Sequence, residues 1–203
     1  MSKEIEIKIK LEDNQEKQLR EWLIQNAKFM DKLNMIDYYL DNPKKSLYKI
    51  SPDGFKDPLE FWRVRQIDNV YFLCNKKRII DENGRTVSVE ENEAVTPEGE
   101  AIIQILKKRG LTDQVIIYKT REIFQFKDFE IVFDNVKNLG KFVEIELKSD
   151  EQDPVQGKNL IYDLLKKIGI KEFTQFDRGY LCMMLNPKSS FGEKVELNKI
   201  GQK

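Results

Sequence analysis

The sequence predicts an α+β protein built around an eight-stranded antiparallel β-barrel, a tunnel with a charged interior, flanked by about three to four helices. Eight segments alternate apolar and polar residues with the period of a strand, and helical apolar stripes separate some of them. The polar positions of the strands are unusually rich in charge. A chain of 203 residues is long enough to bury a sizeable core.

The strand segments are rich in Ile, Val, Phe and Tyr, and turn signals such as Asp68-Asn69 and Lys127-Asp128 separate them. The predicted strands cover residues 3–11, 28–40, 59–67, 70–78, 84–94, 114–126, 129–136 and 141–149. The stretch 41–58, which contains three prolines, is expected to be a loop.

Helices are expected where apolar residues recur with the period of an α-helix. The predicted helices cover residues 13–26, 97–109, 154–168 and, as a short last helix, 177–185. Thr96 and Pro97 are a suitable N-cap and first residue for the second helix. We expect one domain over residues 1–186 and a polar, flexible tail over residues 187–203.

The composition excludes whole classes of active site. The chain has no histidine, so it holds no Ser-His-Asp triad, no HExxH zinc helix and no imidazole acid or base. Its two cysteines, Cys74 and Cys182, lack the CxxC spacing and are expected to be buried free thiols in a reducing compartment. Any catalysis must therefore use carboxylates, Lys, Arg, Tyr or a bound metal.

Charge and hydropathy also limit the partners. The chain has 35 Lys and Arg against 35 Asp and Glu, which argues against a protein that coats nucleic acid or an anionic membrane. The opening residues MSKEIEIKIK contain no apolar signal-peptide core, and no apolar run approaches the length of a membrane span. We expect a cytoplasmic protein, either a monomer or a homodimer.

Charged residues share single faces of several predicted strands. In residues 3–11, Ile residues occupy one face while Glu4, Glu6 and Lys8 occupy the other. The cations on such faces are Lys8, Arg63, Arg65, Lys76, Lys119 and Arg121. The carboxylates are Glu4, Glu6, Asp134, Glu144 and Glu146. One such face alone is typical of a solvated sheet surface.

Taken together, these faces predict a different arrangement. If the sheet closes with its apolar side under the helices, the charged side lines the interior, where unpaired charge is costly. Paired carboxylates supply the oxygen ligands that Mg²⁺ or Mn²⁺ prefers, and the cations suit phosphate oxygens. The pattern therefore indicates a site for a metal-bound phosphate chain.

The sequence resembles the CYTH superfamily, the triphosphate tunnel metalloenzymes, over roughly residues 3–185. Its opening ExExK motif is Glu4-Ile5-Glu6-Ile7-Lys8, and the remaining motifs follow in the family's order. They are Asp37-Tyr38-Tyr39-Leu40-Asp41, Arg63-Val64-Arg65, Lys76, Lys119-Thr120-Arg121, Asp134, Leu139-Gly140, Phe142-Val143-Glu144-Ile145-Glu146 and Tyr180.

The resemblance implies a role for each matching residue. Metal ligation is implied for Glu4, Glu6, Glu144, Glu146 and Asp134, and phosphate binding for Lys8, Arg63, Arg65, Lys76, Lys119 and Arg121. Lys8, Glu4 and Glu6 are the implied catalytic residues, with Lys8 or a second metal orienting the nucleophile. Further candidates for the site are Tyr39, Glu91 and Tyr180.

Two segments depart from the family's pattern. In residues 84–94 the register is open: Glu90 faces the charged side if Val87 and Val89 face away, whereas a bulge brings in Glu91 and Glu93. Near the C-terminus the family often has Ser-Tyr, where this chain has Gly179-Tyr180, so a hydroxyl contact is in question there.

The resemblance is greatest to the class IV adenylyl cyclase and thiamine triphosphatase branch, and we expect a divalent-metal-dependent enzyme acting on a triphosphate. In compact size and in the Asp37-x-Tyr39 strand end the chain resembles the class IV adenylyl cyclases more, and this resemblance implies conversion of ATP to cyclic AMP and pyrophosphate. The alternative is a triphosphatase that hydrolyses thiamine triphosphate, inorganic triphosphate or a nucleoside triphosphate. A non-catalytic polyphosphate or nucleotide sensor is a further alternative, and a nucleic-acid binder ranks last.

Overall fold

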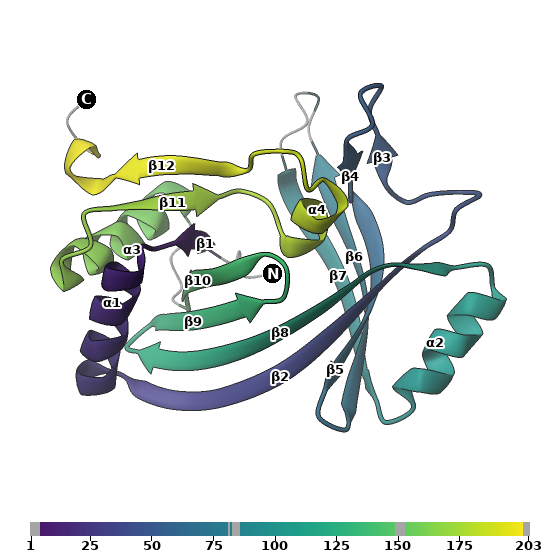
Figure 1. Ribbon diagram of the computed structural model, residues 1–203, viewed down its shortest axis with the longest axis horizontal. Helices are drawn as coiled ribbons and strands as arrows, with labels where there is room; N and C mark the ends of the chain where they lie inside the picture. The colour runs from purple at the N-terminus through teal and green to yellow at the C-terminus, as the bar shows by residue number, and fades with distance from the viewer. Residues whose placement is uncertain (1–4, 81, 83–85, 149–152, 201–203) are drawn as a thin grey trace. The chain divides into compact units, whose positions relative to one another are not determined.

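The computed structural model describes residues 5–80, 82, 86–148 and 153–200, with the backbone alone at 86–89. Ten strands form one antiparallel sheet in the order β12-β11-β1-β10-β9-β8-β2-β5-β6-β7 (Figure 1). Their bounds are β1 Ile5–Lys10, β2 Lys28–Asp41, β5 Glu60–Ile67, β6 Val70–Ile80, β7 Thr86–Thr96, β8 Thr112–Phe126, β9 Phe129–Val136, β10 Gly140–Leu147, β11 Glu172–Phe176 and β12 Gly192–Glu196.

The remaining elements are a small hairpin, four α-helices and a helical turn. The hairpin pairs β3 (Lys49–Ile50) with β4 (Lys56–Asp57). The helices are α1 Asp13–Asn26, α2 Gly99–Lys108, α3 Pro154–Ile168 and α4 Tyr180–Leu185, and the 3-10 turn is Leu197–Lys199. Among the described residues, no helix combines the length and the apolar character that a membrane span requires.

The α+β class and the predicted elements are confirmed. Each of the eight predicted strands and four predicted helices is present, with ends shifted by a few residues. The expected turns at Asp68-Asn69 and Lys127-Asp128 are also present, and Asp68 and Lys127 have positive φ angles of 51° and 50°. Both cysteines are buried free thiols.

The closed eight-stranded barrel is not confirmed. The large sheet has ten strands, and in the described part of the chain β7 and β12 are each paired along one side only. The two additional strands, β11 and β12, extend the sheet beyond β1. β11 was missed because its sequence, EFTQF, is short and does not alternate.

The described part of residues 187–203, the segment expected to be a polar and flexible tail, contains a strand and a buried leucine, and the boundary at residue 186 stays a prediction. Residues 192–196 form β12, which pairs with β11 along its whole length. The following residue, Leu197, is 1% exposed and belongs to the main hydrophobic core. Isolated apolar residues in a polar sequence carry a weak signal, yet here Val195 and Leu197 anchor the segment.

The chain packs as two compact units. Unit 1 comprises Met1–Lys32, Thr120–Arg178 and Ser190–Lys203, and unit 2 comprises Leu33–Lys119 and Gly179–Ser189. Strands β2 and β8 each contribute residues to both units. The single domain expected over residues 1–186 stays a prediction.

In unit 1, α1 and α3 cover the apolar face of the sheet. Ile5, Ile7 and Ile9 of β1 are at most 4% exposed and pack with Leu19 of α1 and Leu165 of α3. Because side chains alternate along a strand, burying the Ile face turns the charged residues of β1 to the opposite face. The hydrophobic effect thus decides which way the charges point.

The ends of α3 follow directly from its sequence. The Asp153 side chain accepts a hydrogen bond from the Val155 backbone N–H at 2.8 Å, and Pro154 occupies the first turn. Gly169 ends the helix with a φ of 94°, a left-handed conformation that favours glycine. These signals explain why the predicted and observed bounds of α3 coincide.

Unit 2 has the same division of faces. Leu40 of β2, Val64 of β5 and Tyr71 of β6 form a buried cluster with Ile103 of α2. The residues that alternate with these in β2 and β5 are charged or aromatic, and they lie on the opposite face of the sheet.

Substituting Leu197→Ala tests whether the C-terminal segment is part of the fold. Truncating a fully buried leucine is expected to lower the free energy of unfolding by about 3 kcal/mol. The matched control is Leu160→Ala on α3, where the side chain is 45% exposed and a loss below about 1 kcal/mol is expected. Urea unfolding measures both, and equal small losses would show that the segment is not anchored.

Candidate functional site

The charged face of unit 1 is held together by ion pairs between neighbouring strands. Lys8 of β1 and Glu144 of β10 are directly opposite in the strand register, and Lys8 Nζ lies 3.1 Å from Glu144 Oε1. The two side chains are 13% and 15% exposed. The pairing of β1 with β10 thus brings together a predicted phosphate-binding cation and a predicted metal ligand.

Arg121 of β8 binds two carboxylates of the same face. Its Nε and Nη2 donate to the two oxygens of Asp134 at 2.8 and 2.6 Å, and Nη2 also donates to Glu144 Oε2 at 2.6 Å. Asp134 is 1% exposed, so its charge depends on this guanidinium for compensation. The two-pronged contact is the geometry that a guanidinium also uses to bind phosphate.

Further along the same strands, three glutamates lie in one row. Glu146 of β10 is directly opposite Glu6 on β1 and Glu130 on β9, so the three side chains project to one side of the sheet. Lys148 Nζ lies 2.7 Å from Glu146 and 3.9 Å from Glu130. Aligned carboxylates repel one another, and a cation beside them relieves this repulsion.

In unit 2, Arg65 of β5 holds the buried carboxylate of Asp37 on β2. Arg65 Nε and Nη2 donate to the two Asp37 oxygens at 2.6 and 2.9 Å, and Asp37 is 2% exposed. Burial raises the pKa of Asp37, but the hydrogen bonds and charge of Arg65 outweigh it and hold the pKa below its ordinary value. Asp37 therefore stays ionised at neutral pH.

Tyr39 and Arg63 are neighbours across the pairing of β2 with β5. They are strand partners, and the Tyr39 ring packs edge-on against Phe61 with centroids 5.3 Å apart. Burial, reinforced by Asp37, raises the pKa of Tyr39 to about 12. Burial alone lowers the pKa of Arg63, yet Tyr39 and Asp37 raise it overall, so Arg63 stays cationic.

The open register of β7 resolves in favour of Glu91 and Glu93. Lys76 Nζ lies 3.0 Å from Glu91, and Arg63 Nη2 lies 3.7 Å from Glu91 and 3.3 Å from Glu93. Glu90 is instead the strand partner of Lys77. The irregularity in the β6–β7 pairing lies at Ile79 and Ile80, opposite the start of β7.

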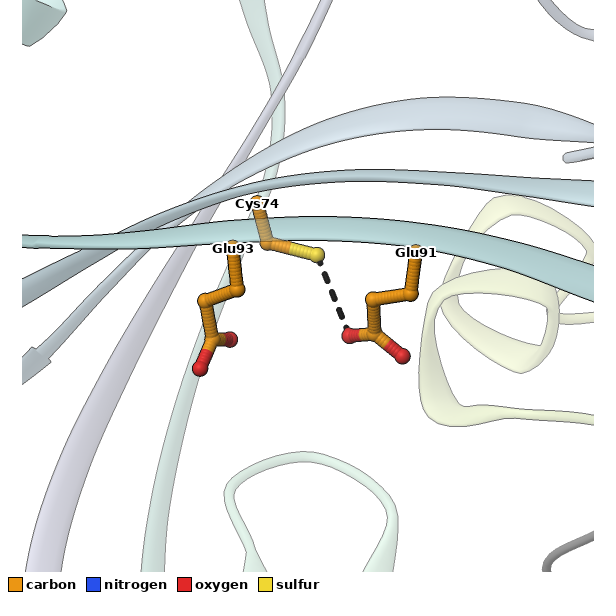
Figure 2. Close-up of side chains that lie close together, drawn as sticks. All are labelled: Cys74, Glu91 and Glu93. Carbon is orange, nitrogen blue, oxygen red and sulfur yellow. Dashed lines mark hydrogen bonds between the residues drawn. The ribbon is translucent and has the colours of Figure 1, made fainter. Parts of the chain in front are cut away.

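Cys74 completes this cluster on β6 (Figure 2). Its thiol is 3.2 Å from Glu91 Oε1, and ligand atoms of Cys74, Glu91 and Glu93 all lie within 4.8 Å of one another. This is the one such group of three within the described residues. Burial raises the pKa of Cys74 to about 11, with Glu91 adding to the effect against the lowering by Arg63, so the thiol is protonated at neutral pH.

As it stands, the Cys74 cluster is better suited to cations of the protein than to a metal ion. A thiol binds metal as the thiolate, and Arg63 and Lys76 already engage both carboxylates. The row of Glu6, Glu146 and Glu130 is a better match to Mg²⁺ or Mn²⁺, because it supplies oxygen donors alone.

Lys119 and Tyr180 lie together in unit 2. Lys119 Nζ is 5.4 Å from the centre of the Tyr180 ring, and the two residues are 6% and 7% exposed. A protonated amine is attracted to an aromatic face at this distance. Tyr180 thus contacts a predicted phosphate-binding residue even though the serine of the family's Ser-Tyr pair is a glycine here.

Within each unit, the described cations and carboxylates share one face, and most of them form ion pairs with each other. Glu4 lies outside the described residues. Among the predicted metal ligands that are described, Asp134 and Glu144 bind Arg121, and Glu146 binds Lys148. Three of the predicted metal ligands are thus engaged in ion pairs. Among the described residues, no three of the predicted ligands have ligand atoms within 4.8 Å of one another, as Cys74, Glu91 and Glu93 do.

Four residues of these faces were given no role in the site from the sequence. Cys74 and Glu130 were not singled out for it, Asp37 was quoted only within a motif, and Glu93 was named only for one register of its strand. The strand period would have found them, since each stands two or four positions from a candidate on the same strand. Asp37 precedes Tyr39, Cys74 precedes Lys76, Glu93 follows Glu91 and Glu130 precedes Asp134.

A family model described as the CYTH domain matches residues 2–180. A Methanocaldococcus jannaschii protein named a putative adenylate cyclase is 29% identical over 181 residues, which cover 88% of this chain and 96% of that protein. The PH1819 protein of Pyrococcus horikoshii is 26% identical with a TM-score of 0.66, covering 92% of this chain and all of that one.

A Hippeastrum protein has the same fold at lower identity. It is described as a putative adenylyl cyclase with a dominant triphosphatase activity, and it superposes with a TM-score of 0.65 at 17% identity. The match covers 92% of this chain and 96% of that one.

Substituting Asp37→Asn is expected to lower the free energy of unfolding by about 3 kcal/mol at neutral pH, because Arg65 loses its buried partner. The pKa of Asp37 is depressed in the folded state, so its contribution is present above the ordinary value of 3.8 and is lost as the pH falls below it. The stability gap between wild type and variant should therefore close in acid.

Urea unfolding of both proteins, from neutral pH down to about pH 3, measures this gap. The control is Asp163→Asn, whose side chain is 68% exposed beside Lys166, and a change below about 0.5 kcal/mol is expected. A gap for Asp37→Asn that is independent of pH would contradict the assignment.

Proposed function

Since the chain belongs to the family defined by the CYTH domain, we propose that it is a divalent-metal-dependent enzyme that acts on a bound triphosphate. The observation that carries this proposal is the pair of guanidinium forks, Arg65 on Asp37 and Arg121 on Asp134. Each fork is held in the planar, two-pronged geometry that fits a phosphate group.

The cations of both charged faces are proposed to bind phosphate oxygens. In unit 1 these are Lys8 and Arg121, and in unit 2 they are Arg63, Arg65, Lys76 and Lys119. Phosphoryl transfer depends mainly on positioning and charge neutralisation, with little covalent chemistry for side chains to perform. A chain without histidine is compatible with that demand.

The glutamates of unit 1 are proposed to hold Mg²⁺ or Mn²⁺. Glu6 and Glu146 face each other across β1 and β10, and Glu130 extends the row. Glu4, Asp134 and Glu144 are further proposed ligands from the family pattern. When bound, the metal neutralises phosphate charge and polarises the phosphorus–oxygen bonds. The proposed role of Lys8 is to orient the nucleophile.

We favour the adenylyl cyclase reaction, in which the ribose 3′-hydroxyl of ATP attacks the α-phosphorus and pyrophosphate leaves. The name of the Methanocaldococcus jannaschii relative, at 29% identity, supports this choice. Hydrolysis, with water attacking the terminal phosphorus, is the second candidate. The triphosphatase activity stated for the Hippeastrum protein is the observation that supports hydrolysis as a candidate.

Product analysis distinguishes these reactions. The purified protein is incubated with Mg²⁺ or Mn²⁺ and ATP, inorganic triphosphate or thiamine triphosphate. Cyclic AMP with an equal amount of pyrophosphate is the expected result with ATP, whereas orthophosphate would identify a triphosphatase. Binding of tripolyphosphate without any product would identify a sensor. The absence of both binding and turnover would refute the proposed function.

Substituting Lys8→Met tests the role of the proposed phosphate-binding and orienting lysine. We expect kcat/KM for the turned-over triphosphate to fall by about 100-fold or more, the typical loss when one charge-stabilising donor is removed. Lys17→Met is the control, because Lys17 is 77% exposed and its contact with Glu21 is loose at 3.8 Å. A Lys8→Met protein with normal kcat/KM and an unchanged melting temperature would exclude Lys8 from the site.

A further inference from the structure

Two buried hydrogen-bond donors of unit 2 have no acceptor among the described residues. They are the Tyr48 hydroxyl, Oη, and the Arg63 Nε. Most buried polar groups in folded proteins are paired, so an unpaired donor requires an explanation. In a protein that binds an anion, the explanation can be an acceptor that arrives with the ligand.

The segment that carries Tyr48 is well anchored. The two oxygens of Asp41 accept hydrogen bonds from Ser46 Oγ at 2.6 Å and from the Leu47 backbone N–H at 2.8 Å. The Tyr48 backbone N–H donates to Ser46 Oγ at 3.0 Å. The surrounding polar groups are therefore satisfied, and the Tyr48 hydroxyl, on a residue only 6% exposed, is the exception.

Tyr48 lies beside the charged face of unit 2. Burial raises the pKa of its phenol, and the nearby Asp41 and Tyr39 raise it further, so these residues are close enough to act on it electrostatically. Tyr39 is in turn the strand partner of Arg63. Tyr39 is thus a neighbour of both residues that carry the unpaired donors.

The remaining contacts of Arg63 leave its Nε as the unused donor. Its Nη2 lies 3.3 Å from Glu93 and 3.7 Å from Glu91, and the side chain is 11% exposed. Because Nε is unpaired, the guanidinium can donate to an additional oxygen atom without losing its existing ion pairs.

We propose that Tyr48 Oη and Arg63 Nε donate hydrogen bonds to oxygen atoms of the bound phosphate chain. This inference rests on the proposed function and adds Tyr48, which lies outside the family's series of motifs, to the residues that bind the triphosphate. Arg63 Nε can only donate and the Tyr48 hydroxyl can donate as well, so a ligand rich in acceptors satisfies both atoms at once. Phosphate oxygens, anionic and rich in lone pairs, meet this requirement.

The substitution Tyr48→Phe separates binding from folding. It keeps the ring and removes only an unpaired hydroxyl, so the melting temperature should be equal to that of the wild type or higher. The dissociation constant for tripolyphosphate should increase about tenfold, as expected for the loss of a hydrogen bond to a charged group. Calorimetric titration with tripolyphosphate in metal-free buffer measures this constant without turnover.

Tyr162→Phe is the matched control. The Tyr162 hydroxyl donates to Gln175 Oε1 at 2.8 Å in unit 1, so its removal breaks an existing hydrogen bond. We expect this variant to melt at a lower temperature than the wild type and to bind tripolyphosphate with unchanged affinity. Tyr48→Phe should therefore weaken binding without lowering the melting temperature, and Tyr162→Phe should lower the melting temperature without weakening binding.

If the wild type binds tripolyphosphate and Tyr48→Phe binds it with the same affinity, this inference is overturned and the proposed function still stands. A clear decrease in the melting temperature of Tyr48→Phe would also overturn it, since the hydroxyl would then have a partner in the free protein. Failure of the wild type to bind tripolyphosphate would overturn the inference, and the proposed function would fall with it only if the protein also turned over none of the triphosphates in the presence of Mg²⁺ or Mn²⁺.

Discussion

The pairing of buried charges constrains this structure more than any other interaction. Asp37 and Asp134 are at most 2% exposed, and each is matched by the fork of one arginine. An ion removed from water without a partner costs several kcal/mol, so each charge on these faces requires another of opposite sign. Strand register provides the match, as with Lys8 and Glu144 on neighbouring strands.

This arrangement has a consequence for ligand binding. Most of the cations proposed to hold phosphate already hold carboxylates, so an incoming anion competes with groups of the protein itself. Arg121, for example, is shared between Asp134 and Glu144. A ligand that arrives with a divalent metal can offer a positive charge to the carboxylates at the same time, which conserves the charge balance of the face.

The sequence predicted the elements well because their signals are local. Alternating Ile residues defined β1, and Asp153, Pro154 and Gly169 marked the ends of α3. The closed eight-stranded barrel was not confirmed, since β11 and β12 add to the sheet. Their position is determined by pairing with distant strands, and short segments such as EFTQF carry little signal of their own.

The sequence also identified most charged residues of the candidate site, but it did not identify which of them are partners. Alternation identified most charged members of the two faces, whereas the partners within each face depend on register between strands. The choice between Glu90 and Glu91 could not be made from β7 alone, because it depends on where the β6–β7 pairing becomes irregular. Tyr48 carried no pattern at all, and only its unpaired hydroxyl distinguishes it.

In unit 2, the protein shifts the pKa values of several ionisable groups further from pH 7, some downward and some upward. The carboxylates of Asp37 and Glu91 have lowered pKa values, whereas the pKa of Cys74 is raised to about 11 and that of Tyr39 to about 12. With no imidazole in the chain, these groups keep the same charge from mildly acidic to mildly alkaline solution. This face therefore behaves as a fixed array of charges, and protons taken up or released near neutral pH must come from the ligand or its solvent.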